Sequence, residues 1–113
     1  MKLVARVPKS ELANGALVRV TYPPFDVLVT MVDGEPCAIE DGCNHAGASL
    51  SEGERTDDGA CVSCPMHGYL FDLRTGKLVA PHGLCDDQRR FEATLEGDDV
   101  VVWDPGGVAI VGL

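Results

Sequence analysis

The sequence predicts an all-β domain. Short apolar stretches rich in valine recur about every eight to twelve residues with turn residues between them, a spacing typical of antiparallel β structure. Helical periodicity is weak along the whole chain. Its 113 residues are close to the commonest length of one domain, so we expect residues 1–113 to form a single domain.

The expected strands follow the apolar stretches in chain order. Valine, isoleucine and aromatic side chains suit a pleated, half-buried surface, and they dominate these stretches. One helical turn is expected at Lys9–Leu12. The expected strands are Lys2–Val7, Ala16–Tyr22, Phe25–Val32, Cys37–Glu40, Ala60–Ser63, Leu70–Asp72, Arg90–Leu95 and Val100–Trp103.

Turn residues separate these stretches. The segment TYPPF ends one strand before the next begins, and VDGEP and EGDDV place Gly and Asp at hairpin turns. In RTGK, Gly76 supplies a residue that tolerates positive φ. Phe91 and Trp103 are expected in the core. Six aspartates at turn-like positions are expected on the solvated surface: Asp57, Asp58, Asp86, Asp87, Asp98 and Asp99.

The charge balance restricts the possible partners. Eighteen acidic residues against nine basic ones give a formal net charge of −9, which repels phosphate backbones and anionic lipid head groups. Nucleic acid and membrane surfaces are therefore poor partners, whereas a protein with a basic docking face would be attracted. The first residues are too weakly apolar for a secretory signal, and no apolar run approaches the roughly 20 residues needed to cross a bilayer. We expect a cytoplasmic protein.

Two short segments each combine a cysteine with a histidine. His45 follows Cys43 by two positions, and His67 follows Cys64 by three. Two thiolates and two imidazoles could hold either a tetrahedral zinc ion or a [2Fe–2S] cluster. In the common zinc pattern one segment carries both cysteines and the other both histidines. Here each carries one of each, so each loop could reach both irons of a binuclear cluster. Backbone-shaping residues flank both segments: Gly42, Gly47, Pro65 and Gly68.

The stretch from Cys43 to Gly76 resembles Rieske-type ferredoxins, in which C-x-H, a spacer and C-x-x-H bind a [2Fe–2S] cluster. CNHAGASLSEG resembles the first cluster loop of the family, HGYLFDLRTGKL the segment after its second loop, and APHG its proline loop. The resemblance implies a Rieske fold, with antiparallel sheets forming a base domain and a small cluster-binding subdomain of two loops at about 41–83. It also implies one cluster per chain, with Cys43 and Cys64 on the buried iron and His45 and His67 on the outer one.

Departures from one branch of the family indicate a low potential. The high-potential Rieske proteins resemble C-x-H-x-G-C and C-x-C-H-G-S-x-Y, with a disulfide and with hydroxyls that donate hydrogen bonds to the cluster. The corresponding positions here are Ala48, Met66, Tyr69 and Phe71, so the disulfide is missing and Phe71 offers no hydroxyl. We expect Tyr69 to face outward. Donors near the sulfurs stabilise the reduced cluster, so we expect a potential near the low end of the Rieske range, roughly −150 mV.

The resemblance implies a soluble one-electron carrier. It would pass electrons from a flavin-dependent reductase to a terminal oxygenase of the aromatic-ring hydroxylating type, docking through its acidic surface as a monomer or weak oligomer. It would not be an enzyme itself, because once His45 and His67 are used only His82 remains for a mononuclear iron site. Two alternatives stay open: a Rieske-like small subunit of a reductase such as nitrite reductase, and a zinc-binding interaction module.

Three further cysteines have no assigned role. Cys61 and Cys64 formally match a redox Cys-x-x-Cys motif, but no strand-then-helix context accompanies them, so we expect Cys61 to be a buried strand residue. Cys37 and Cys85 lack ligand-like neighbours apart from His82, which we expect in a loop near the cluster. In a reducing cytoplasm such thiols are usually buried apolar groups or metal ligands rather than disulfides.

Overall fold

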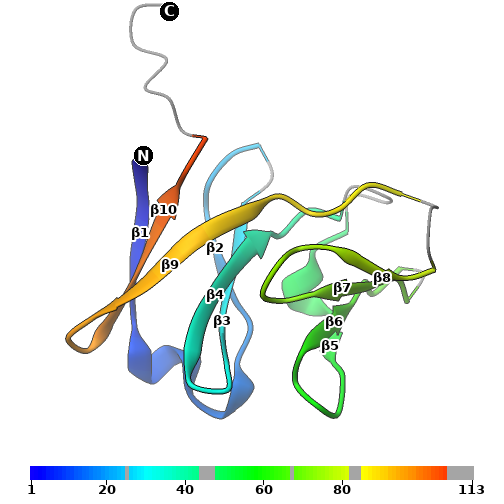
Figure 1. Ribbon diagram of the computed structural model, residues 1–113, viewed down its shortest axis with the longest axis horizontal. Coiled ribbons are helices and arrows are strands. Elements are labelled where there is room, and N and C mark those ends of the chain that lie inside the picture. Colours follow the sequence, from blue (N-terminus) through cyan, green and yellow to red (C-terminus); the bar gives the residue numbers. More distant parts are fainter. Residues whose placement is uncertain (25, 44–47, 67, 82–84, 107–113) are drawn as a thin grey trace, which may run out of the picture.

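The computed structural model consists of two antiparallel sheets that lie side by side, with two short 3-10 helices (Figure 1). It describes residues 1–24, 26–43, 48–66, 68–81 and 85–106. All strand pairs in this part of the chain are antiparallel. The predicted all-β fold with antiparallel sheets is therefore confirmed.

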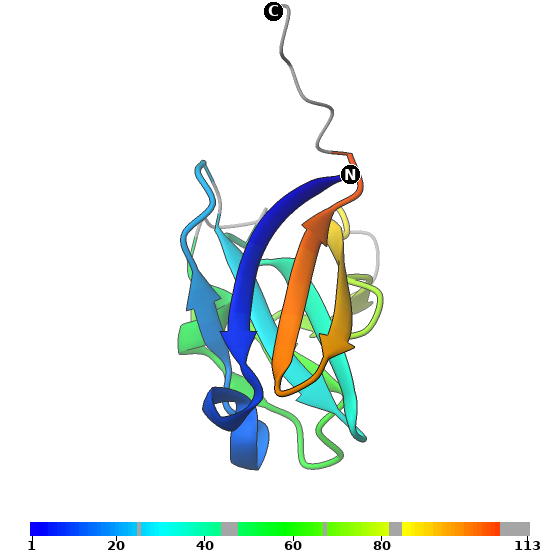
Figure 2. The same cartoon turned by 90° about the vertical axis from the view of Figure 1, so that its left-hand side faces the viewer.

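The larger sheet has six strands in the order β1-β10-β9-β4-β3-β2. The strand nearest the N-terminus pairs with the last strand, from Lys2 opposite Asp104 to Pro8 opposite Asp99. Figure 2 shows these two strands, in blue and orange, running next to each other. The strands are β1 (Lys2–Pro8), β2 (Val18–Val20), β3 (Val27–Val32), β4 (Glu35–Glu40), β9 (Arg90–Glu96) and β10 (Asp99–Asp104).

The smaller sheet has four short strands in sequential order, β5 to β8. The chain leaves the large sheet at the end of β4, builds the small sheet and returns at β9, which pairs with β4. The small sheet is thus an insertion between two neighbouring strands of the large one. Its strands are β5 (Glu54–Arg55), β6 (Cys61–Ser63), β7 (Leu70–Asp72) and β8 (Leu78–Ala80).

The β3–β4 hairpin lies between two hydrophobic cores. Side chains of a strand alternate between its two faces, so Leu28 and Val32 enter one core while Val27 and Val29 enter the other. The loop-side core holds Leu28, Val32, Cys37, Ile39, Cys43, Leu50, Val62, Cys64, Phe71 and Leu73. The base core holds Val7, Leu12, Val27, Val29, Ala38, Phe91, Val100 and Val102.

The turns form as the sequence predicts. Asp33 and Gly34 both have positive φ, at 50° and 80°, which is the backbone of the tight turn that best joins two twisted strands. Gly76 has a φ of 77°, and a Cβ there would lie 2.3 Å from the carbonyl oxygen of Gln88. Both its conformation and its close neighbour therefore require glycine.

The eight predicted strands are confirmed within two residues at each end; the least accurate is Ala16–Tyr22, which is Val18–Val20. The expected helical turn at Lys9–Leu12 extends further, to Gly15, as η1 (Lys9–Gly15). Phe25 lies outside the described residues. Strands β5 and β8 and helix η2 (Leu50–Glu52) were not predicted, because these elements are two or three residues long and hold no alternating pattern. Phe91 is buried as expected, while Trp103 is only half-buried.

The helices of the described segments are short. None of them is long and apolar enough to cross a membrane. Whether the chain as a whole is one domain stays a prediction.

Gly53 lies where η2 passes close to β6, and this contact gives a stability test. A Cβ on Gly53 would lie 1.8 Å from the carbonyl oxygen of Ser63, a backbone atom that cannot turn aside. We expect Gly53→Ala to lower the free energy of unfolding by about 3 kcal/mol or more, measured by denaturant unfolding. The control is Gly34→Ala, which has open space around its Cβ and should lose only about 1–2 kcal/mol through its positive φ. Equal losses in the two variants would contradict the account.

Candidate metal centre

Two loops with the same closing hydrogen bond carry the predicted cysteine ligands. Cys43 follows β4, and its backbone N–H donates to the carbonyl of Ala48 at 2.8 Å. Cys64 follows β6, and its N–H donates to the carbonyl of Tyr69, also at 2.8 Å. In both loops the acceptor lies five positions after the cysteine, although the two sequences differ. The same backbone hydrogen bond therefore closes both loops.

Each loop is fixed further at its base. Gly42 and Ser49 form an isolated antiparallel bridge that joins the two limbs of the first loop. In the second loop the N–H of Gly68 donates to the carbonyl of Cys64 at 2.9 Å, and Gly68 adopts a φ of 71°. The glycine predicted to flank this segment is thus needed for its tight return.

Both thiols are turned into the same apolar interior. Cys43 and Cys64 are each 2% exposed and both belong to the loop-side core, with Leu50 and Val62. The structure therefore brings together the two predicted cysteine ligands, which are 21 positions apart in the sequence. His45 and His67 lie outside the described residues, as does His82. Within the described part of the chain, no three His, Cys, Asp or Glu side chains are grouped to hold a metal ion.

The donor set fits an iron–sulfur cluster. Thiolates are the usual protein ligands of such clusters, and a buried, apolar setting excludes water from the metal. Cys43 and Cys64 are two buried thiols on separate, hydrogen-bonded loops, and their chemistry is that of two such ligands.

Asp41 joins the two limbs of the first loop from inside. Its carboxylate is 1% exposed and accepts the hydroxyl of Ser49 at 2.5 Å and the backbone N–H of Ser51 at 2.8 Å. The guanidinium Nε of Arg19 lies 3.6 Å from the same carboxylate. Arg19 also donates to Asp26 at 2.9 Å. Because Asp41 stands two positions before Cys43, this network supports the chain at the point where the loop begins.

Gln88 also holds the first loop, through the residues just before Cys43. Its side chain is buried, and its Nε2 donates to the carbonyls of Glu40 at 3.0 Å and Gly42 at 2.7 Å. Its backbone N–H donates to Gly76 at 2.7 Å. Gln88 therefore connects the limb before Cys43 to the chain that returns from the small sheet. Neither Asp41 nor Gln88 was predicted as a supporting residue, since nothing in an isolated Asp or Gln signals burial.

Arg55 connects the small sheet to the large one. Its guanidinium donates to the carbonyl of Gly15 at 3.2 Å, to the hydroxyl of Thr30 at 3.0 Å and to the carbonyl of Gly59 at 2.5 Å. Thr30 is fully buried in β3. This contact fixes the small sheet, and with it Cys64, against the β3–β4 hairpin.

The remaining cysteines behave as apolar groups. Cys37 is buried in the loop-side core, and burial raises the pKa of its thiol. Cys61 lies on β6 as predicted, but it is only half-buried. Burial likewise raises the pKa of Cys61 and of Cys85. The structure describes all five cysteines, and none of them forms a disulfide.

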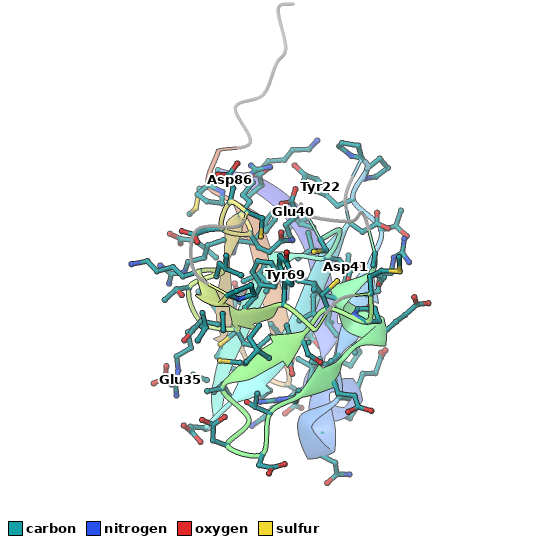
Figure 3. The ribbon with its side chains drawn as sticks, turned by 90° about the vertical axis from the view of Figure 1, so that its right-hand side faces the viewer. Tyr22, Glu35, Glu40, Asp41, Tyr69 and Asp86 are labelled. Atoms are coloured by element: carbon teal, nitrogen blue, oxygen red, sulfur yellow. The ribbon has the colours of Figure 1, made fainter. Side chains whose placement is uncertain are left out.

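The positions that distinguish the family branches have clear surroundings. Phe71 is fully buried and has no hydroxyl, and Met66 is 60% exposed at the tip of the second loop. Tyr69 is half-buried and packs against the loop-side core, so its expected outward orientation is wrong. Figure 3 shows it in the middle of the face that carries the small sheet. The aspartates expected on the surface are exposed, except that Asp99 is half-buried.

Comparison with known proteins decides the family. The model of the Rieske [2Fe-2S] domain matches residues 2–84. The chain belongs to the Rieske [2Fe–2S] domain family. Its cofactor is therefore a Rieske-type [2Fe–2S] cluster, which decides the choice between cluster and zinc left open by the two Cys–His segments.

Relatives within the family are ferredoxin components. The chain is 42% identical to the ferredoxin component of biphenyl 2,3-dioxygenase from Rhodococcus jostii (strain RHA1), over 96% of this chain and 98% of that one. It is 34% identical to the ferredoxin subunit of 3-phenylpropionate/cinnamic acid dioxygenase from Escherichia coli (strain K12), over 90% and 93% of the two chains.

Solved structures agree on the fold. The ferredoxin of carbazole 1,9a-dioxygenase from Nocardioides aromaticivorans IC177 superposes with a TM-score of 0.80 at 23% identity, covering 91% of this chain and 98% of that one. A ferredoxin structure described as a complex of reduced oxygenase and oxidized ferredoxin in carbazole 1,9a-dioxygenase gives 0.75 at 31% identity, covering 92% of both chains. The predicted Rieske fold is confirmed.

The two hydrogen bonds from Gln88 can be tested with a variant of similar shape. Gln88→Met keeps the volume but removes both donors, which leaves the part-buried carbonyls of Glu40 and Gly42 without these partners. An unsatisfied buried group costs about 1–3 kcal/mol, and these two carbonyls are only partly buried, so we expect the free energy of unfolding to fall by about 1–3 kcal/mol. Chemical denaturation of the two proteins measures this. Wild-type stability in Gln88→Met would show that the side chain does not hold the loop.

Proposed function

We propose that this protein is a one-electron carrier, the ferredoxin of a multicomponent aromatic-ring dioxygenase system. It takes electrons from a flavin-dependent reductase and delivers them to a terminal oxygenase. The observation that carries the proposal is the match to ferredoxin components over nearly their whole length, 98% of the biphenyl dioxygenase ferredoxin. The complex of oxygenase and ferredoxin among the structural relatives supports the oxygenase as the electron acceptor.

The proposed ligands are Cys43, His45, Cys64 and His67. Cys43 and Cys64, the two of these residues that the structure describes, support the set. Both thiols are buried in one core, and each cysteine begins a loop that the same backbone hydrogen bond closes. When bound, the cluster supplies a group that gains and loses a single electron. The protein's part is to hold the loops in place through Asp41, Gln88 and Arg55 and to keep water from the thiolate side.

Catalysis is assigned to another protein. The chain contains three histidines, and the proposed cluster uses two of them. His82 alone cannot provide the two histidines of a mononuclear iron site of the terminal-oxygenase type. This supports a role as carrier rather than as enzyme.

The proposed docking surface surrounds the two cysteine loops and is acidic. Asp86 and Asp87 are exposed and directly follow Cys85, which packs against the loop-side core. Glu40 and Asp86 lie on the face seen in Figure 3 together with Tyr69. With a net charge of −9, such a face attracts a partner that presents basic residues. The exposed Met66 adds an apolar contact at the tip of the second loop.

The reductase-subunit alternative has weaker support. A structure named as a putative nitrite reductase small subunit superposes with a TM-score of 0.72 at 19% identity, which indicates the fold alone. Cytoplasmic location and a monomeric or weakly oligomeric state stay predictions of the sequence.

Electron delivery under changing salt tests the proposal. The chemically reduced protein is mixed in a stopped-flow instrument with the terminal oxygenase of a biphenyl 2,3-dioxygenase, and loss of the reduced-cluster signal is followed. We expect rapid reoxidation whose second-order rate constant falls as ionic strength rises, because screening weakens attraction between opposite charges.

A pair of charge variants makes this test specific. Asp86→Asn lies beside the cysteine loops and should lower the rate constant about two- to fivefold at low salt. Asp98 lies in the β9–β10 turn, which Figure 1 shows at the end of the large sheet away from the small sheet. Asp98→Asn should therefore leave the rate constant unchanged. No reoxidation would contradict the carrier role, and a flat salt profile would contradict acidic docking.

A further inference from the structure

Two buried aspartates have nearly the same set of partners in different parts of the fold. The first is Asp41, which is 1% exposed. It accepts one hydroxyl, from Ser49 at 2.5 Å, and one backbone N–H, from Ser51 at 2.8 Å. One guanidinium, that of Arg19, lies 3.6 Å away.

The second is Asp104 at the end of β10, which is 3% exposed. It also accepts one hydroxyl, from Tyr22 at 2.6 Å, and one backbone N–H, from Gly106 at 2.9 Å. One guanidinium, that of Arg89, donates to it. Burial alone would raise the pKa of Asp104, but the hydrogen bonds from Tyr22 and Arg89 outweigh it, and the pKa lies below its usual value.

The two sites differ in their position relative to the cysteine loops. Asp41 is two positions before Cys43, so their Cα atoms are at most about 7 Å apart. Its partners Ser49 and Ser51 belong to the returning limb of the same loop. Asp104 lies on β10, which β9 separates from β4 in the sheet. Only the first carboxylate is therefore built into a loop that carries a proposed ligand.

A buried charge at this place acts on any electron that arrives nearby. Reduction adds one negative charge, and a nearby buried carboxylate repels it because the protein interior screens charge weakly. A guanidinium beside that carboxylate acts in the opposite direction. Arg19 is 53% exposed, so water screens its effect more than that of Asp41.

We propose that Asp41 and Arg19 are opposed charges that set the reduction potential of the cluster, the carboxylate lowering it and the guanidinium raising it. This inference rests on the part of the proposed function that places the cluster at the Cys43 and Cys64 loops. It does not depend on which protein receives the electron. Asp41 is thus a positioning residue whose charge also acts at long range.

The test compares four variants of the iron-loaded full-length protein. Asp41→Asn and Arg19→Gln remove the two charges with little change of shape, and Asp104→Asn and Arg89→Gln remove the same groups from the matched site. The midpoint potential is measured by redox titration followed by electron paramagnetic resonance, and thermal stability is measured on the same samples.

We expect shifts of opposite sign at the first site. Asp41→Asn should raise the equilibrium constant for reduction about threefold to tenfold, which raises the midpoint potential by about 30 to 60 mV for a one-electron couple. Arg19→Gln should lower it by a smaller factor, since it leaves Asp41 and Asp26 uncompensated. The two control variants should lose thermal stability and keep the wild-type midpoint.

Other results overturn the inference. If Asp41→Asn and Arg19→Gln shift the midpoint in the same direction, or if Asp104→Asn shifts it as much as Asp41→Asn, loosening of the fold explains the effect. If Asp41→Asn does not fold, Arg19→Gln alone tests the proposal, because the Arg19 side chain is at the surface. An unchanged midpoint potential in Arg19→Gln then contradicts the proposal. A wild-type protein that holds a cluster but does not reduce the oxygenase contradicts the carrier role and leaves this inference standing.

Discussion

The closing hydrogen bond of each cysteine loop is the contact on which the site depends. Cys43 and Cys64 each donate their backbone N–H to a carbonyl five positions on, and each directs its side chain into the loop-side core. Each bond fixes the two ends of its loop relative to each other, which lowers the entropy cost of placing the thiol when a metal binds. The two thiols share one core because the β3–β4 hairpin supplies one side of that core and the small sheet the other.

Buried and half-buried polar side chains hold these loops in place. Asp41, Gln88 and Arg55 come from different parts of the chain, and each bridges backbone segments that hydrophobic packing alone would leave free to slide. Hydrophobic contacts are non-directional, whereas a hydrogen bond fixes both distance and angle. An electron carrier benefits from this arrangement, because a rigid site changes little when its charge changes.

The fold class and the family could be predicted from the sequence, and the two segments with the proposed ligands stand out in it, because all three depend on local patterns. Valine-rich stretches with Asp-Gly turns specify hairpins, and two Cys–His segments with glycine and proline neighbours are rare. The supporting residues were not predictable in this way. Asp41 in EDGC reads as a turn residue and Gln88 in DDQRR as part of a solvated loop. Their burial depends on contacts with segments up to 48 positions away, which no local pattern encodes. Tyr69 was misjudged for the same reason.

The most direct test of the account is to replace one proposed ligand, Cys64, and to compare that variant with one in which the nearby Cys61 is replaced. In protein produced with ample iron and sulfide, wild-type and Cys61→Ser should each contain about two irons and two sulfides per chain. Both should show the electron paramagnetic resonance signal of a reduced [2Fe–2S] cluster. Cys64→Ser, three positions away, should lose most of the iron, sulfide and signal. A full complement of iron and sulfide with an unchanged spectrum in Cys64→Ser would show that the second loop does not bind the cluster.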